Sequence, residues 1–207
     1  MFRDRQDAGR LLARKLEEFR GQDAVVLALP RGGVVLGYEI AQALQLPFDI
    51  VVTRKIGHPN DPEYAICAVD EKGTLLCNEA ERASIDPVWL KEETHRQQKE
   101  AHRRAILYRG GKEPVALAGK TVIIADDGVA TGLTMRLAIA AVRVHHPKRI
   151  IVVVPVAPSD VVQKIKREAD DIIVLESPED FLGAVGTHYE RFDQVEDAEV
   201  VRLLTKN

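Results

Sequence analysis

Residues 122–135 read VIIADDGVATGLTM, and this stretch carries the most informative pattern in the chain. The apolar run 122–125 is typical of a strand buried in a sheet. The run ends on two adjacent carboxylates, Asp126 and Asp127, which are costly to bury unless hydroxyl or cationic groups meet them. A turn rich in Gly, Ala and Thr follows and leads into a helical pattern. The stretch therefore predicts a strand, a ligand-binding turn and a helix.

The same order of strand, loop and helix recurs along the chain. Apolar runs predict strands at 24–29, 48–53, 121–126, 149–154 and 171–175. Helical patterns follow at 34–44, 131–144 and 159–167. This alternation predicts an α/β fold with a mostly parallel central sheet flanked by helices. Because ligands bind beyond the carboxyl ends of such strands, we expect the loops 30–33, 54–62 and 126–134 at one edge.

Other segments surround this core. The pattern predicts an N-terminal helix at 5–19, a small hairpin from 64–69 and 74–77, and a helix near 198–204. Residues 54–62 are too rich in Pro, Gly and Asn to predict a regular element. A long polar helix is expected over 85–108, with Asp86 as its N-cap and Trp89 as an anchoring residue.

Composition narrows the class of protein. The chain has 207 residues, of which 45% are hydrophobic and 29% charged, with a net charge of −3. It can bury a core, and neither a nucleic-acid partner nor a membrane is indicated. We expect a soluble, cytoplasmic protein in which Cys67 and Cys77 are reduced thiols rather than a disulfide.

The turn after the acidic pair has the chemistry of a phosphate cradle. Gly128 and Gly132 let the backbone approach a ligand, and Thr131 and Thr134 offer hydroxyl groups. The helix that follows presents free N–H groups and the positive end of its dipole. The two carboxylates would repel a phosphate but suit a sugar diol. A ribose phosphate satisfies both halves, whereas surface aspartates that merely cap the helix are the simpler alternative.

Residues 122–134 resemble the phosphoribosyl diphosphate (PRPP) signature of type I phosphoribosyltransferases. The matching positions are Asp126, Asp127, Val129, Thr131, Gly132 and Thr134. Ala125 and Gly128 replace bulkier apolar residues, and the glycine is expected to loosen the turn. The resemblance implies that the two acids hold the ribose hydroxyls. It also implies that the rest of the signature binds the 5-phosphate and ribose: Gly128, Val129, Ala130, Thr131, Gly132, Leu133 and Thr134.

Two further segments fit the family. Its members hold pyrophosphate in a short loop after the first core strand, often with a cis peptide, and Arg31, Gly32 and Gly33 lie there. Its members also close a mobile loop over the site, and Arg54 and Lys55 stand where that loop begins. Read without the family, these segments are an ordinary turn and a solvated surface loop.

The whole chain looks most like an uncharacterised "predicted phosphoribosyltransferase" group, with which it shares the tail sequences FLGAVG (181–186) and YERFDQV (189–195). The resemblance implies one domain over 1–207, with a core at 24–175. A hood would be formed by 1–23 and 176–207, and the helix at 85–108 is an insertion.

The implied reaction is displacement of pyrophosphate from C1 of PRPP by a nitrogen nucleophile. Mg²⁺ is the expected cofactor, bound mainly through the substrate near the acidic pair. The catalytic residues implied are Asp126, Asp127, Arg54, Lys55 and Glu63. Ala130 stands where enzymes acting on 6-oxopurines carry an aspartate, so another nucleobase is the expected acceptor. Glu63 with Tyr64 resembles a Glu-aromatic pair of adenine phosphoribosyltransferases.

Recognition of the base is assigned to the loop after the next strand and to the tail. The residues implied are Pro155, Val156, Ala157 and Phe181. Phe181, Tyr189 and Phe192 could stack on the base or pack in a small core of their own. The basic helix at 85–108 could touch RNA or a phosphorylated acceptor, or could simply be solvated.

Three functions remain open from the sequence. The first is the Mg²⁺-dependent transferase, with PRPP and a small acceptor as its partners. The second is a PRPP-binding regulatory protein without transferase activity, although a closing loop favours the enzyme. The third is an unrelated phosphate-binding fold with an acidic pair. The sequence argues against nucleic-acid partners and leaves a homo-oligomer open.

Overall fold

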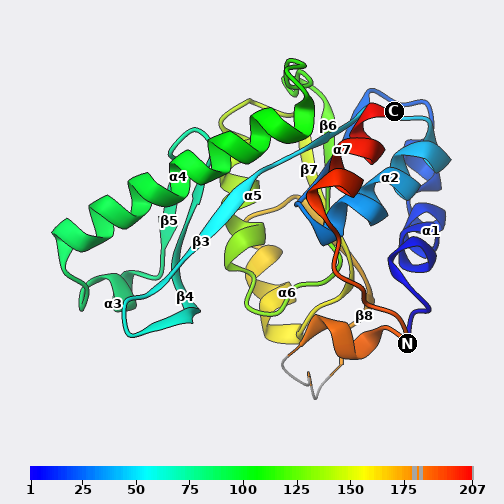
Figure 1. The fold of residues 1–207 in the computed structure, drawn as a ribbon. Helices are drawn as coiled ribbons and strands as arrows, with labels where there is room; N and C mark the ends of the chain where they lie inside the picture. Colours follow the sequence, from blue (N-terminus) through cyan, green and yellow to red (C-terminus); the bar gives the residue numbers. More distant parts are fainter. Residues whose placement is uncertain (179–180, 182–183, 207) are drawn as a thin grey trace.

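The central sheet is parallel throughout, as predicted. The computed structural model describes residues 1–178, 181 and 184–206 (Figure 1). Five strands lie in the order β2-β1-β6-β7-β8. They are β1 (Ala24–Ala28), β2 (Phe48–Ile50), β6 (Thr121–Ala125), β7 (Arg149–Val156) and β8 (Asp171–Glu176). The register pairs Ala28 with Ala125 and Ala125 with Val153, so the strands end together at one edge of the sheet.

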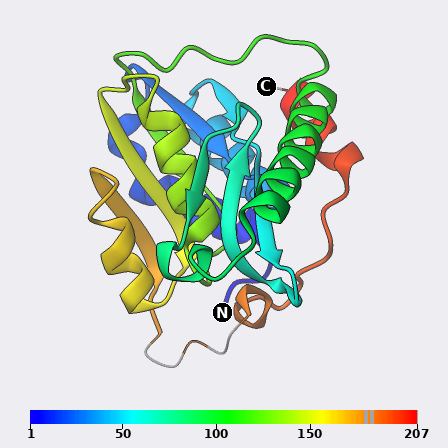
Figure 2. The ribbon, with the colours of Figure 1, turned by 90° about the vertical axis from the view of Figure 1, so that its left-hand side faces the viewer.

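Alternate residues of the strands face two separate apolar layers. Val26 and Ile123 face a core with α1 (Arg5–Lys15), α2 (Gly32–Leu44) and α7 (Asp197–Thr205). Their neighbours Val25 and Val122 face a second core with α5 (Leu133–Arg143) and α6 (Ser159–Ile165). Figures 1 and 2 show helices on both sides of the sheet. The predicted α/β class is confirmed. Short 3₁₀ turns, η1 (Glu17–Phe19) and η2 (Val185–His188), complete the described helices.

A second, three-stranded antiparallel sheet contains the predicted hairpin. It consists of β3 (Thr53–His58), β4 (Asp61–Asp70) and β5 (Leu75–Cys77). The expectation that residues 54–62 form no regular element was wrong, because β3 starts this sheet. An added Cβ on Gly57 would lie 2.1 Å from the carbonyl oxygen of Pro62, so the glycine allows a close strand crossing at an irregular pairing. Composition alone gave no sign of this.

The long helix expected over 85–108 is α4 (Pro87–Arg109), which lies along the three-stranded sheet (Figures 1 and 2). The Asp86 carboxylate accepts hydrogen bonds from the backbone N–H groups of Val88 and Trp89, so the predicted N-cap is confirmed. Gly110 ends the helix with a φ of 58°. Trp89 packs against the small core beneath, as predicted. A short helix, α3 (Glu79–Arg82), precedes α4 and was not predicted.

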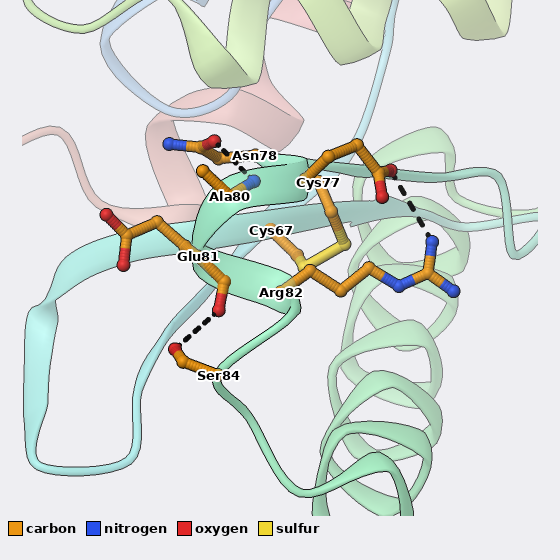
Figure 3. Close-up of a disulfide and its surroundings, with 8 residues drawn as sticks. Cys67, Cys77, Asn78, Ala80, Glu81, Arg82 and Ser84 are labelled. Atoms are coloured by element: carbon orange, nitrogen blue, oxygen red, sulfur yellow. Dashed lines mark hydrogen bonds and ion pairs between the residues drawn. A yellow bond between two sulfur atoms is a disulfide. The ribbon is translucent and has the colours of Figure 1, made fainter.

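Cys67 and Cys77 form a disulfide, so the expectation of reduced thiols was wrong (Figure 3). The two residues lie directly opposite each other in the β4–β5 pairing, with their Cα atoms 4.0 Å apart. This register brings the sulfur atoms together, and the spacing of the cysteines in the sequence could not reveal it. The bond links β5, and α3 after it, to the buried strand β4.

No helix in the described part of the chain is both long and apolar enough to cross a membrane.

Candidate active site

The two glycine-containing loops of the site start side by side. Loop 30–33 follows β1 and loop 126–132 follows β6, and the two strands are hydrogen-bonded neighbours. The Leu29 N–H donates to the Ala125 carbonyl over 3.0 Å, which extends the contact to the ends of both strands. The structure therefore brings together the acidic pair and the loop of Arg31, Gly32 and Gly33.

The acidic pair is desolvated and its two carboxyls interact. The Asp127 N–H donates to Asp126 Oδ1 over 2.9 Å. Burial, followed by the charge of Asp127, raises the pKa of Asp126 well above its ordinary value. Burial also raises the pKa of Asp127, against the opposing charge of Arg5. Two buried carboxylates at the end of a strand favour a ligand that supplies hydroxyl groups or a cation.

The Pro30–Gly33 loop packs directly on these acids. The Pro30–Arg31 peptide bond is cis, as the resemblance implied. An added Cβ on Gly32 would lie 1.8 Å from Asp127 Oδ2, and one on Gly33 would lie 2.9 Å from the Asp126 Cα. Only glycine fits at either position. Because α2 begins at Gly32, the first N–H groups of that helix lie next to the acids.

The side chain of Arg31 faces the tail. Its Nη1 lies 3.6 Å from Asp197 Oδ1 and 3.8 Å from Glu196 Oε2. Asp197 also accepts a hydrogen bond of 2.7 Å from Tyr108 Oη of α4. Burial raises the pKa of Tyr108 to about 12. The loop, α4 and the start of α7 are thus joined by one polar cluster around Asp197.

The signature turn is tightly packed rather than loosened. An added Cβ on Gly128 would lie 2.4 Å from Val185 Cγ1 and 3.0 Å from Val156 Cγ1. The Val129 N–H donates to the Val156 carbonyl over 3.0 Å. Gly132, with a φ of 82°, immediately precedes α5. The expectation that Gly128 loosens the turn was wrong, because the tail fills the space that a side chain would need.

The remaining residues of this turn are open to a ligand. Ala130 and Thr131 are exposed, and Leu133 and Thr134 are half-buried at the start of α5. The first N–H groups of α5 therefore lie next to two threonine side chains, as a phosphate site requires.

The comparisons with known proteins agree with this geometry. The model of the phosphoribosyl transferase domain family matches residues 4–191. The chain belongs to this family. Two proteins of Mycobacterium tuberculosis, each named "Putative phosphoribosyl transferase" (MT0597 in strain CDC 1551 / Oshkosh, Rv0571c in strain ATCC 25618 / H37Rv), are 38% identical over 208 residues. The match covers 100% of this chain and 47% of each relative, so the chain spans about half their length.

Solved structures support the fold of this phosphoribosyl transferase domain. The protein TT1426 from Thermus thermophilus is 40% identical, with a TM-score of 0.84 over 100% of this chain and 98% of that chain. The AQ2163 protein from Aquifex aeolicus is similar in fold alone, at 12% identity and a TM-score of 0.53 over 86% of this chain and 78% of that chain.

The basic pair expected to open the mobile loop lies in strand β3 of the domain. Arg54 Nε donates to Gln97 Oε1 of α4 over 3.0 Å. Burial, and then the charge of Arg104, lowers the pKa of Arg54. Because successive residues of a strand point to opposite faces, Lys55 lies on the face away from this contact. Glu63 lies in β4, and its side chain is outside what the structure describes.

The expected base-binding residues are mostly covered. Pro155 and Val156 are the last residues of β7 rather than part of a loop, and both are buried, as is Ala157. Phe181 stacks on His188, with ring centroids 5.4 Å apart. A base contact by these residues stays a prediction.

Arg5 was missed by the sequence analysis, and Tyr189 and Phe192 were considered there only as residues that stack on the base or pack in a core. Arg5 Nε donates to Asp127 Oδ2 over 2.7 Å, and its guanidinium lies 3.7 Å from the centroid of the Phe192 ring. Tyr189 Oη donates to the Asp127 carbonyl over 2.5 Å. Tyr189 also packs against Phe2 and Phe192, and these aromatics pack in the main core with α1 and α2 rather than in a small core of their own. The tail sequence YERFDQV was a signal, but nothing singled out Arg5.

Three of the six Lys and Arg residues on α4 form ion pairs within the helix. Arg96 pairs with Glu93, and Arg103 and Arg104 both pair with Glu100, at 2.7 Å in each case. These partners lower the pKa of Glu100 to about 2. The pairing supports a solvated helix rather than a nucleic-acid surface.

The described residues contain no group of three or more His, Cys, Asp or Glu side chains placed to hold a metal ion. Asp126 and Asp127 are the carboxylates nearest the expected substrate. Two carboxylates are too few for a complete Mg²⁺ shell, but they fit an ion that is held mainly by substrate oxygens and water.

Proposed function

We propose that this protein is a Mg²⁺-dependent phosphoribosyltransferase. It transfers the phosphoribosyl group of PRPP to a nitrogen of a small acceptor, a nucleobase other than a 6-oxopurine, and releases pyrophosphate. The observation that carries the proposal is the packing of Gly32 on Asp127, because it places the N-terminus of α2 beside the acidic pair. The N-terminus of α5 follows the same pair within one turn.

The proposed roles follow from charge and position. Asp126 and Asp127 accept hydrogen bonds from the ribose hydroxyls. Residues 128–134, with the N–H groups that open α5, bind the 5-phosphate. Residues 31–33, with the N–H groups that open α2, bind the pyrophosphate. Arg31 would leave Asp197 and bind the pyrophosphate instead. The pyrophosphate carries more negative charge than Asp197 and would lie closer to the positive end of the α2 dipole.

In the reaction, the C1–O bond to pyrophosphate breaks while a bond from the acceptor nitrogen to C1 forms. The acceptor nitrogen loses its proton, and Glu63 is the proposed receiver. Arg54 and Lys55 lie on opposite faces of β3, so the one that turns toward the site when the loop closes neutralises charge that develops on the leaving group. Mg²⁺, when bound through substrate oxygens beside Asp126 and Asp127, supplies further neutralisation of the pyrophosphate. Exclusion of water protects the electron-poor C1 centre.

The acceptor assignment depends on Ala130. This residue is exposed at the open side of the turn, where a carboxylate would be needed to accept a proton from a 6-oxopurine. A methyl group offers neither charge nor a hydrogen bond. An acceptor with a different pattern of donors is therefore favoured.

A panel assay tests the proposal. Pyrophosphate release from PRPP and Mg²⁺ is measured with purine and pyrimidine bases, for the unmodified protein and for Asp126→Asn. Asp160→Asn is the matched control, because Asp160 is exposed on α6 and pairs with the nearby Lys164. We expect release with at least one base that is not a 6-oxopurine, and loss of release in Asp126→Asn alone. PRPP binding without release for any base would instead support a regulatory protein.

A further inference from the structure

Arg5 and Asp127 form a nearly buried ion pair inside the proposed PRPP site. Their side chains are only 11% and 15% exposed, and Arg5 Nε lies 2.7 Å from Asp127 Oδ2. The same oxygen is the atom that excludes a side chain at Gly32. Arg5 therefore acts at the point where the acidic pair meets the loop expected to bind pyrophosphate. One oxygen of Asp127 is thus held by Arg5 of α1.

The C-terminal tail holds Arg5 in place from the other side. Arg5 Nη1 donates to the Asp193 carbonyl over 2.6 Å, and the Arg5 guanidinium lies over the Phe192 ring. Tyr189, from the same segment, donates to the backbone carbonyl of Asp127. Thus Arg5 of α1 binds the side chain of Asp127, and Tyr189 of the tail binds its backbone carbonyl. A guanidinium suits this position because its planar fork can serve two acceptors while stacking on a ring.

Acids near Arg5 do not compete for it. Asp4 caps α1 by accepting from the Asp7 N–H, and it pairs with Arg191. Asp7 pairs with Arg3. The charge of Arg5 is therefore directed at the acidic pair.

This charge opposes the effect of burial. Burial raises the pKa of both Asp126 and Asp127, and Arg5 works in the opposite direction at both carboxyls. The groups that face Asp127 are Asp126 from its own loop, Arg5 from α1 and the Tyr189 hydroxyl from the tail. Burial raises the pKa of Tyr189, so this hydroxyl stays neutral. Loop 30–33 meets the Asp127 carboxylate through Gly32, which has no ionisable group. Arg5 is thus the cation in contact with Asp127.

We propose that Arg5 is a positioning residue for PRPP binding, which orients the Asp127 carboxylate for the ribose hydroxyls. Through Arg5, the N-terminal helix and the C-terminal tail become part of the ribose site. This inference rests on the proposed function, since it assigns Asp127 to the ribose of PRPP.

The test is calorimetric binding of PRPP with Mg²⁺ between pH 5 and 9 (a range of about two units either side of neutral), with no acceptor present. The variants are Arg5→Gln and Arg5→Lys, and the control is Arg10→Gln, which removes an exposed arginine of the same helix paired with Glu39. At pH values below the pKa of Asp127, Arg5→Gln should weaken binding by about tenfold for each unit that this pKa rises. A raised pKa means that the Asp127 carboxyl ionises only at higher pH. The pH below which Arg5→Gln loses affinity for PRPP should therefore be higher than in the unmodified protein.

Arg5→Lys keeps the charge but cannot serve both acceptors with a planar fork. It should restore the pH profile and only part of the affinity, while Arg10→Gln should match the unmodified protein. The inference is overturned if Arg5→Gln binds PRPP with unchanged affinity and an unchanged pH profile. A uniform loss in both Arg5 variants, with no movement of the profile, would also overturn it, because that result indicates a structural role alone. If Arg5→Gln does not fold, Arg5→Lys decides by its profile: a shift away from that of the unmodified protein overturns the inference.

Failure of the proposed function gives a different result. In that case the unmodified protein itself does not bind PRPP at any pH.

Discussion

The Val185 side chain lies where a side chain on residue 128 would have to lie: an added Cβ on Gly128 would be 2.4 Å from Val185 Cγ1. Gly128 departs from the usual aliphatic residue of the PRPP signature. Val185 belongs to the tail sequence that this chain shares with the uncharacterised phosphoribosyltransferase group. The Val185 side chain therefore fills the space that a larger residue at position 128 would need. This packing explains why the signature has a glycine there.

Gly128→Ala should therefore destabilise the protein, by about 1–3 kcal/mol as expected for overpacking. In the background Val185→Ala the same substitution should cost less, because the nearest methyl groups are gone, although the contact with Val156 and the positive φ of residue 128 remain. Denaturant unfolding of the two single variants and the double variant measures the coupling. Additive effects would show that the two side chains do not compete for this space.

Asp126→Asn should stabilise the fold while it removes PRPP binding. The pKa of Asp126 is raised in the folded protein, so its contribution to stability falls as pH rises from its ordinary value through the raised one. Above the raised pKa the full cost is present, at about 1.4 kcal/mol for each unit of the shift. Asparagine does not ionise, so the variant lacks this cost of burying a charge. Unfolding curves are measured at about pH 4, near the ordinary pKa of an aspartate, and at about pH 7. The free energy of unfolding of Asp126→Asn should exceed that of the unmodified protein at the higher pH only. A variant less stable at both would contradict this explanation.

The sequence predicted the parallel sheet because its strands are continuous apolar runs with clear helical patterns between them. It also placed the acidic pair and the two glycine loops at one edge, since the carboxyl ends of neighbouring parallel strands must meet there. Gly32 and Gly33 then proved to be required by contact with the acids rather than by turn geometry.

The missed features depend on contacts between residues far apart in the sequence. Strand β3 was hidden by Pro and Gly residues that only the pairing with β4 explains. The disulfide depends on the register that sets Cys67 against Cys77. Arg5 is separated from Asp127 by 122 positions, and a single arginine at the start of an amphipathic helix looks like any solvated residue. Tertiary packing alone selects it.

Reduction of the Cys67–Cys77 disulfide should lower the free energy of unfolding. The bond closes a loop of ten residues, and a crosslink of this size contributes about 2–3 kcal/mol through the unfolded chain. Denaturant unfolding with and without a thiol reductant measures the difference. The variant Cys67→Ser/Cys77→Ser serves as the control and should not respond to the reductant. An unmodified protein that is equally insensitive would show that the bond does not form in solution.

Neutralising the exposed face of α4 should have little effect on stability. Arg103 is 58% exposed and pairs with Glu100, and exposed pairs of this kind contribute about 0–1 kcal/mol. We expect Lys99→Gln/Arg103→Gln to unfold within about 0.5 kcal/mol of the unmodified protein and to bind PRPP normally. The same double variant tests the alternative that α4 binds RNA. Salt-sensitive RNA binding by the unmodified protein that is lost in the variant would contradict the view of α4 as a solvated helix.

The most direct test of the central claim is calorimetry with PRPP and Mg²⁺ on Asp126→Asn/Asp127→Asn. The account predicts that the unmodified protein and Asp160→Asn bind PRPP, and that the double variant loses at least about tenfold in affinity, since charge-assisted hydrogen bonds to the ribose are removed. PRPP affinity that survives in the double variant, or no PRPP binding by the unmodified protein, would contradict it.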